Sequence, residues 1–345
     1  MKTFAAKLVA WQKRHGRHDL PWQGTRDPYA VWVSEIMLQQ TQVATVIPYY
    51  ARFMRRFPNV VALAAASQDE VLAHWSGLGY YSRARNLHRA AQIVARDHGG
   101  RFPADFEQVV QLPGIGRSTA AAICVFAFGA RRAILDGNVK RVLTRCFGIA
   151  GHPGDKRIAD VLWRKAEELL PRNNVGAYIQ GLMDLGAGVC VRRRPRCAEC
   201  PLRDECMAYR QGLTERLPEP KSRKTLPRKT TVMLVLQHAG EVLLEKRPET
   251  GIWGGLWCFP EVAPGQDAEI GRICARRFGA RVTAPEPLPA LEHGFTHFRL
   301  SITPQRLRVT ALAPRAAEPG HVWLPLEEAR SAAIPAPVRR ILAGL

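Results

Sequence analysis

Four cysteines lie close together in an arginine-rich segment of the sequence. They are Cys190, Cys197, Cys200 and Cys206, spaced as Cys-x6-Cys-x2-Cys-x5-Cys. Four thiolates at this spacing can reach one metal centre, although the spacing is looser than the paired Cys-x2-Cys of zinc ribbons. The pattern favours one [4Fe–4S] cluster, with zinc as the alternative. Disulfides are disfavoured, because no secretory signal is evident and a reducing cytosol would not keep them.

The charge of the chain is strongly positive and unevenly distributed. The 345 residues carry a formal net charge of +20. Residues 1–229 hold 37 Lys and Arg against 19 Asp and Glu, a net charge of +18, whereas residues 230–345 hold 13 against 11, a net charge of +2. This asymmetry indicates a polyanionic partner that binds mainly the first two thirds of the chain. There is no apolar run of membrane-spanning length.

Two carboxylates lie where they could take part in chemistry. Glu35 has apolar neighbours at helical spacing, so desolvation would raise its pKa and let it act as an acid near neutral pH. The alternative is an exposed helix glutamate. Asp136 precedes a basic helix, and its simplest role is that of an N-cap. Its functional role would be a carboxylate held where a cation develops.

Two glycine-containing segments could contact a nucleic acid. In Leu112-Pro-Gly-Ile-Gly116, the glycines Gly114 and Gly116 allow a tight turn before an alanine-rich helix. Backbone N–H groups at such a helix start can bind a phosphate, although a simple turn would have the same composition. The segment 77–82, Gly-Leu-Gly-Tyr-Tyr-Ser, places aromatic side chains beside arginines, as base stacking requires. A buried aromatic pair is the alternative.

Apolar periodicity predicts how these residues are supported. Helical spacing covers residues 31–46, 60–75, 84–95, 118–128 and 158–170, so residues 1–213 are expected to be mainly helical. Residues 214–229 are polar, basic and proline-containing, which is typical of a linker. Beyond it, two β-type runs flank Ala239-Gly240, residues 300–309 resemble a strand and 268–278 a helix. The sequence therefore predicts a separate α+β domain over residues 230–345.

Several motifs, taken in order, resemble one enzyme family. SEIMLQQTQV, GLGYYSRARNLH, LPGIGRSTAAAI, ILDGNVKRVLTR and the cysteine segment are similar to the helix–hairpin–helix base-excision DNA glycosylases, and most of all to the MutY-type adenine DNA glycosylases. The resemblance implies a hairpin near residues 110–130 and a [4Fe–4S] loop at 190–206. It also implies double-stranded DNA with A:8-oxoguanine or A:G mispairs as partner, monomeric action and a cytoplasmic, nucleoid-associated location.

The resemblance also implies roles for individual residues. Glu35 matches the acid that protonates adenine, and Asp136 matches the carboxylate that stabilises a cationic sugar, a division of labour usual in glycosidic cleavage. The four cysteines match the cluster ligands. The remaining matches are to residues that bind substrate or DNA, namely Trp22, Gln23, Leu38, Gln40, Tyr80, Gly114, Gly116, Ser118, Asn138, Gln180 and Asp184.

Ser118 distinguishes two branches of this family. Endonuclease-III-type enzymes have a lysine here, which forms a Schiff base with the sugar and leads to strand cleavage. A serine beside Arg117 cannot do so, which predicts a monofunctional glycosylase that leaves an abasic site.

Residues 230–345 resemble a Nudix domain that has lost its metal ligands. The helix glutamates of an active Nudix enzyme are replaced by Ile273, Arg276 and Arg277, and arginines cannot bind Mg²⁺. The resemblance therefore implies a domain that recognises 8-oxoguanine without hydrolysing a pyrophosphate. The recognition loop would contain Phe295, Thr296 and His297, with threonine in place of the family's serine.

Overall fold

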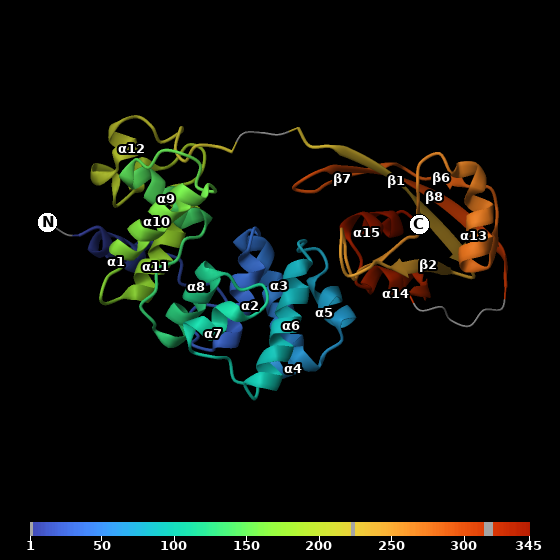
Figure 1. Ribbon diagram of the computed structural model, residues 1–345, viewed down its shortest axis with the longest axis horizontal. Helices are drawn as coiled ribbons and strands as arrows, with labels where there is room; N and C mark the ends of the chain where they lie inside the picture. Colours follow the sequence, from blue (N-terminus) through green and yellow to red (C-terminus); the bar gives the residue numbers. More distant parts are fainter. Residues whose placement is uncertain (1–2, 222–224, 314–319) are drawn as a thin grey trace. The chain divides into compact units, whose positions relative to one another are not determined.

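The computed structural model describes residues 3–221, 225–313 and 320–345. Within it the chain divides into two compact units. The first unit comprises residues 1–65 and 86–223, and the second comprises residues 66–85 and 224–345. The colours of Figure 1 follow the chain through both.

The first unit is helical, as predicted. Its helices are α1 (Phe4–His15), α2 (Pro28–Leu38), α3 (Val43–Arg56), α4 (Val60–Ala65), most of α6 (Ser82–Asp97), α7 (Phe106–Gln111), α8 (Arg117–Phe128), α9 (Gly137–Phe147), α10 (Lys156–Glu168), α11 (Val175–Asp184) and α12 (Met207–Arg210), with a π-helical turn at Leu185–Val189 and 3₁₀ turns at Cys197–Glu199 and Arg203–Glu205.

Three predicted helices are confirmed and two predicted boundaries are wrong. The helices expected at 84–95, 118–128 and 158–170 correspond to α6, α8 and α10. The helix expected at 31–46 is two helices, because Gln40 adopts a φ of 57° between α2 and α3. The helix expected at 60–75 is also interrupted, since the Ser67 side chain caps α5 (Gln68–Trp75) by accepting the Glu70 N–H. Apolar spacing alone does not reveal such breaks.

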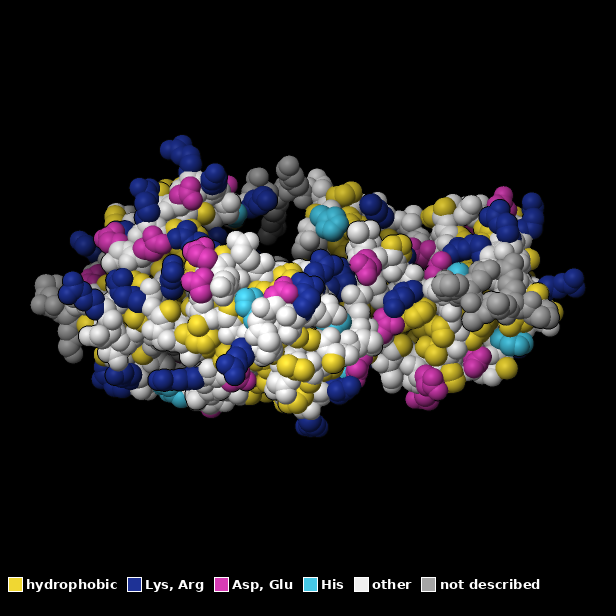
Figure 2. Space-filling view, turned by 60° about the horizontal axis from the view of Figure 1, so that its bottom comes forward, with side chains coloured by type: hydrophobic (Ala, Val, Ile, Leu, Met, Phe, Trp, Pro, Cys, Tyr) yellow, Lys and Arg dark blue, Asp and Glu magenta, His cyan; other side chains and the backbone are white. Residues whose placement is uncertain are grey.

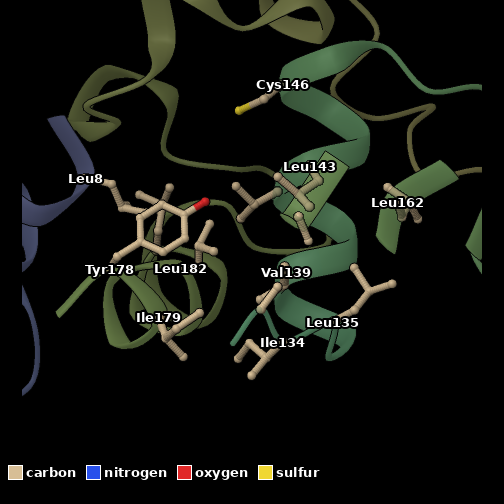
Figure 3. Packing of buried hydrophobic residues seen from close by; sticks show 14 of the residues in the cluster. Leu8, Ile134, Leu135, Val139, Leu143, Cys146, Leu162, Tyr178, Ile179 and Leu182 are labelled. Carbon is tan, nitrogen blue, oxygen red and sulfur yellow. The ribbon is translucent and has the colours of Figure 1, made fainter. Parts of the chain in front are cut away.

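One hydrophobic core cluster of the first unit forms where α9 and α11 meet. Val139 and Leu143 on α9 face Tyr178 and Leu182 on α11, and Leu8 on α1 closes one side (Figure 3). All five side chains are at most 1 % exposed. At about 25 cal/mol per Å² of buried apolar surface, side chains of this size stabilise the unit by roughly 1.5–3 kcal/mol each. This core fixes the start of α9, where Asp136 lies.

The second unit is a mixed sheet with helices. Its strands are β1 (Arg228–His238), β2 (Glu241–Lys246), β3 (Trp257–Cys258), β4 (Glu261–Val262), β5 (Ala280–Val282), β6 (Glu286–Pro287), β7 (Leu291–Gly294), β8 (Arg299–Leu312) and β9 (His321–Pro325). Its helices include α5 (Gln68–Trp75), α13 (Ile270–Phe278), α14 (Leu326–Ser331) and α15 (Ala336–Ala343). The main strand order is β3-β2-β1-β8-β5, with β1 and β8 parallel. Figure 1 shows α13 on one side of the sheet and α14 and α15 on the other.

The predictions for this region are confirmed in kind. β1 and β2 form the expected hairpin, in which Ala239 and Gly240 both have positive φ, and β8 and α13 correspond to the predicted strand and helix. β1 begins at Arg228, inside the predicted linker. The predicted fold class, a mainly helical region followed by an α+β domain, is correct.

The boundary of the second unit differs from the predicted one, because residues 66–85 belong to it. The Ser76 hydroxyl donates to the Ile334 carbonyl at 2.8 Å, and Lys246 Nζ lies 2.6 Å from Asp69 Oδ1. Contacts between residues so far apart in the chain leave no periodic signal in the sequence.

Candidate active site

A cavity of about 890 Å³ lies in the first unit, within the range of small-ligand sites. It is bounded by α2, α8, α11 and the segment that follows α1. The residues predicted from the sequence that line it are Trp22, Gln23, Glu35, Leu38, Gly116, Ser118, Asp136, Asn138 and Gln180. Gln40, Gly114 and Asp184 are not among its lining residues.

Glu35 lies on the cavity side of α2. The helix is apolar around it, with Val31, Ser34 and Ile36 buried and Glu35 itself half-buried. Burial, and secondarily the charge of Asp136, raises the pKa of Glu35 to about 7. A carboxyl group with this pKa is protonated in about half of the molecules at neutral pH and can therefore act as a proton donor.

Asp136 both caps α9 and lines the cavity. Its Oδ1 accepts the Val139 N–H at 2.7 Å, and its Oδ2 accepts the Asn138 amide at 3.1 Å. Burial raises the pKa of Asp136, while these two donors and the charge of Arg141 oppose the rise by favouring the carboxylate. The cap interpretation of the sequence is therefore correct, and the same side chain also faces the cavity that Glu35 lines.

Ser118 and the hairpin hold the loop that precedes Asp136. Ser118 Oγ accepts the Leu135 N–H at 3.0 Å, so the hydroxyl is engaged with backbone. Gly114 has a φ of +79°, and a Cβ there would lie 2.8 Å from the Asn86 Cβ. Gly116, as N-cap of α8, has no side chain to occupy the helix start, which leaves its first N–H groups directed at solvent or ligand.

Several polar residues at the cavity were not predicted from the sequence. Arg17 Nε lies 2.7 Å from Asp184 Oδ1, and Gln180 Nε2 donates to the same oxygen at 2.9 Å. Asp184 is 4 % exposed and does not itself line the cavity. Its carboxylate fixes the positions of the Arg17 and Gln180 side chains, which do. Gln12 and His18 also line the cavity. The only sequence signal for Gln12, Arg17 and His18 as cavity residues is that they lie near Trp22 in the chain.

All four predicted cluster ligands line a second, smaller pocket. Cys190, Cys197, Cys200 and Cys206 share it, and none of the cysteines is in a disulfide. In the described residues, no three His, Cys, Asp or Glu side chains are close enough to hold a single metal ion. Four thiols on one pocket are a donor set that either an iron–sulfur cluster or a zinc ion can use.

A chain of hydrogen bonds joins this pocket to the first cavity. Arg141 Nε donates to the Cys190 carbonyl at 2.7 Å, and its Nη2 donates to Asn138 Oδ1 at 2.9 Å. Asn138 in turn donates to Asp136. In the sequence, Arg141 is distinguished only by its place in a basic helix.

The second unit contains a separate cavity of about 840 Å³. Tyr80, Phe295, Thr296 and His297 all line it, so the structure brings together residues that lie far apart in the sequence. Tyr80 is 44 % exposed with a φ of 48°, while Tyr81 is buried, so the two tyrosines do not form a buried pair. A positive φ at a non-glycine residue is a strained conformation that is often found at functional positions.

Arg277, which the sequence comparison places at the position of a Nudix glutamate, contacts two glutamates of this unit. Arg277 Nη2 donates to both carboxylate oxygens of Glu245, at 2.8 and 2.9 Å, and Nη1 donates to the Glu261 carbonyl. The guanidinium thus places a positive charge beside the Glu245 carboxylate, because one of its nitrogens contacts both carboxylate oxygens.

Lys and Arg side chains are distributed over much of the face shown in Figure 2, with Asp and Glu between them.

Residues 33–168 match the family described as HhH-GPD superfamily base excision DNA repair protein, and residues 231–344 match the NUDIX domain. An adenine DNA glycosylase of Buchnera aphidicola from Acyrthosiphon pisum is 40 % identical over 341 residues, covering 98 % of this chain and 96 % of that protein. The chain belongs to the adenine DNA glycosylase family. The human adenine DNA glycosylase is 34 % identical over 400 residues, covering 98 % of this chain and 73 % of that protein.

Two solved structures share the helical fold of the N-terminal part of the chain. A thermostable thymine-DNA glycosylase matches with a TM-score of 0.56 and 31 % identity, over 60 % of this chain and 95 % of that one. An endonuclease III–DNA complex matches the fold with a TM-score of 0.52 at 21 % identity, over 61 % of this chain and 94 % of that one. The enzyme is a DNA N-glycosylase, and the predicted family and fold are confirmed. No helix in the described residues has the length and apolar character to span a membrane.

Proposed function

We propose that this glycosylase removes adenine paired with 8-oxoguanine or guanine by hydrolysis, leaving an abasic site. The observation that supports this most is the shared cavity of Glu35 and Asp136, one with its pKa raised to about 7 and the other hydrogen-bonded by two donors. A proton donor and a carboxylate on one cavity are the minimum set for breaking a glycosidic bond.

The base must leave the helix before this chemistry begins. A glycosidic bond inside a stacked duplex cannot be reached, so the adenine nucleotide turns out of the stack into the cavity. Trp22, Gln23, Leu38 and Gln180 are our candidates for holding the base. Asp184 keeps Gln180 and Arg17 in place through the hydrogen bond and ion pair described above.

Bond cleavage follows from the protonation states of the two carboxyl groups. Glu35 donates its proton to N7 of the adenine, so that the base departs with the electron pair of the glycosidic bond. The sugar is left with positive charge, which the Asp136 carboxylate offsets. The Glu35 carboxylate then accepts a proton from the water that adds to the sugar.

Strand cleavage is not part of this proposal. A lyase step needs an amine that forms a Schiff base with the sugar. Ser118 has no amine, and its hydroxyl accepts the Leu135 N–H. The reaction therefore ends at the abasic site.

The second unit is proposed to read the base opposite the adenine. Thr296 provides a hydroxyl and Phe295 an aromatic face beside Tyr80 in the cavity of that unit. A hydroxyl can bond 8-oxoguanine at its added oxygen or N7–H, which guanine presents differently. Because Arg277 is already paired with Glu245, a phosphohydrolase role of this unit is disfavoured.

The cysteine pocket is proposed to hold one [4Fe–4S] cluster through Cys190, Cys197, Cys200 and Cys206. When bound, the cluster would cross-link the loop that carries these residues. Arg192, Arg193, Arg194 and Arg196 lie in that loop and would be presented to DNA phosphates.

One assay tests the proposed function. Single-turnover reactions on A:8-oxoguanine, A:G and A:T duplexes are analysed with and without alkali. We expect cleavage products from the first two duplexes only after alkali, with the A:8-oxoguanine duplex faster. Thr296→Ala should slow the A:8-oxoguanine reaction more than the A:G reaction, while Thr296→Ser should not. Nicks without alkali would contradict the hydrolytic end point, and equal rates on A:8-oxoguanine and A:T would contradict the substrate.

A further inference from the structure

Arg145 carries a positive charge in the interior of the first unit. It lies in the last turn of α9 and is 1 % exposed, and it is one of the largest fully buried side chains. A charge removed from water is strongly destabilising unless a counter-charge or several hydrogen bonds compensate it.

The hydrogen bonds of Arg145 are numerous, but none goes to a carboxylate. Nε donates to the Leu217 carbonyl at 2.8 Å, and the two Nη atoms donate to the carbonyls of Val191 and Arg192 at 2.7 and 3.0 Å. Nη1 also lies 3.4 Å from the Cys190 sulfur. Over the described ranges, no Asp or Glu forms an ion pair with this guanidinium. Backbone carbonyls thus accept the hydrogen bonds of the guanidinium, but in the described residues no carboxylate balances its charge.

The cysteine pocket is the place where an anion could compensate this charge. Arg145 lines that pocket together with all four proposed cluster ligands, and its backbone carbonyl lies 3.4 Å from the Cys206 sulfur. A cluster bound by four thiolates carries a net negative charge, which grows when the cluster takes up an electron. The guanidinium is thus adjacent to the one group proposed for this interior that would be an anion.

We propose that Arg145 is the buried counter-charge of the cluster and a determinant of its reduction potential. Its charge and its N–H···S contact to Cys190 stabilise the cluster more when it is more negative. The guanidinium therefore raises the reduction potential and favours retention of the cluster. This inference rests on the proposed [4Fe–4S] cofactor and assigns the cluster no step in base removal.

Three variants separate charge from geometry. Arg145→Gln removes the charge and keeps part of the hydrogen bonding. Arg145→Lys keeps the charge and loses the planar fork. Arg203→Gln is the matched control, because Arg203 lines the same pocket but is 42 % exposed and pairs with Asp204, so solvent and salt screen its charge.

The measurements use the purified, full-length holoenzyme. Iron and acid-labile sulfide per chain establish cluster content, voltammetry gives the reduction potential, and bleaching of the cluster absorbance by a chelator gives its rate of loss. We expect Arg145→Gln to shift the potential to more negative values and to lose the cluster roughly tenfold faster or more, as for other residues that support metal ligands. Arg145→Lys should lie between Arg145→Gln and wild type, and Arg203→Gln near wild type.

Each outcome decides between alternatives. Wild-type potential and cluster retention in Arg145→Gln would overturn the inference, as would an equal shift in Arg145→Lys and Arg145→Gln. If Arg145→Gln does not fold, the reduction potentials of Arg145→Lys and Arg203→Gln still test the inference. A shift in Arg203→Gln as large as that in Arg145→Lys would contradict it, because the exposed charge would then matter as much as the buried one. Wild-type protein that contains zinc or no metal, yet removes adenine, would remove the cofactor proposal and this inference while leaving the proposed base chemistry intact.

Discussion

At the scale of single residues, the function depends on how the protein environment changes two ordinary carboxylic acids. Glu35 is desolvated on an apolar helix, whereas Asp136 receives two hydrogen bonds at a helix start. Burial raises the pKa of both groups, while the two donors to Asp136 and the charge of Arg141 favour its carboxylate form.

Replacing Glu35 by Gln should abolish adenine removal and leave DNA binding close to that of the wild type. The amide preserves size and polarity but cannot donate an acidic proton. Single-turnover cleavage and binding titrations on the same A:8-oxoguanine duplex measure the two effects. Glu107→Gln, the same substitution at an exposed glutamate of α7 that does not line the cavity, serves as a control for general damage. Turnover like that of the wild type in Glu35→Gln would refute the assignment.

The pH dependence should follow the raised pKa of Glu35. The rate should fall about tenfold for each pH unit above 7, because only protonated Glu35 donates. Stability should also respond, since between pH 4.5 and 7 the unfolded chain releases a proton that the folded chain keeps. The free energy of unfolding thus falls by up to about 3 kcal/mol as pH rises through this window. The Glu35→Gln variant should not show this fall. Parallel urea titrations of both proteins check this, and identical pH trends would contradict it.

At the scale of elements, short helices and turns position the reactive groups. α9 begins at Asp136, and the core in Figure 3 holds α9 against α11. The hairpin between α7 and α8 is similarly fixed by Gly114, whose φ is unsuited to other residues.

Asp136 can be changed so that its two roles separate. Asn at this position retains an oxygen for the Val139 N–H, so α9 keeps its cap, whereas Ala loses it and should destabilise the fold by about 1 kcal/mol. Both variants should slow adenine removal by roughly a hundredfold or more, because both lose the charge. Thermal unfolding together with single-turnover rates measures the two effects. An active, stable Asp136→Asn enzyme would show that the charge is unnecessary.

Gly114→Ala should destabilise the protein by more than about 1 kcal/mol and weaken binding to duplex DNA. The new Cβ would meet Asn86 at 2.8 Å in a backbone conformation that disfavours alanine. Gly116→Ala is the matched stability control in the same hairpin, since its φ is −90° and a Cβ there meets nothing within 4 Å. Chemical denaturation of the two variants should differ clearly, and equal midpoints would contradict this account of the hairpin.

At the scale of the whole molecule, charge distribution sets the contact with DNA. The first 229 residues carry a net charge of +18, and residues 230–345 only +2. This asymmetry is independent of any single site and acts through release of counterions from the phosphate backbone.

Binding of undamaged duplex DNA should therefore fall steeply with salt. If six or more phosphates are neutralised, the affinity should drop on the order of a thousandfold between about 50 and 200 mM salt. Fluorescence anisotropy over a salt series measures the slope. Replacing exposed arginines of the cysteine loop, such as Arg193 by Gln, should reduce the slope by about one unit each. A salt-independent affinity would exclude backbone contacts as the main source of binding.

Local signals in the sequence were sufficient for the element types and for many candidate residues. The turn at Ala239-Gly240, the strands around it, the hairpin glycines and the cysteine spacing all depend on neighbours in the chain, so a reader of the sequence can find them. Gly and Asp at turns and caps act through their own backbone, which makes their signals local.

Only the tertiary structure placed Glu35 and Asp136 on one cavity, tied Arg17 to Asp184 and enclosed Arg145 beside the cysteines. It also joined residues 66–85 to the second unit and split two predicted helices. Burial, proximity and pKa depend on which distant segments pack together, and the energy of such packing is shared among many side chains. A sequence specifies the participants in these contacts, but only the folded chain determines how far each of them is from water and from the others.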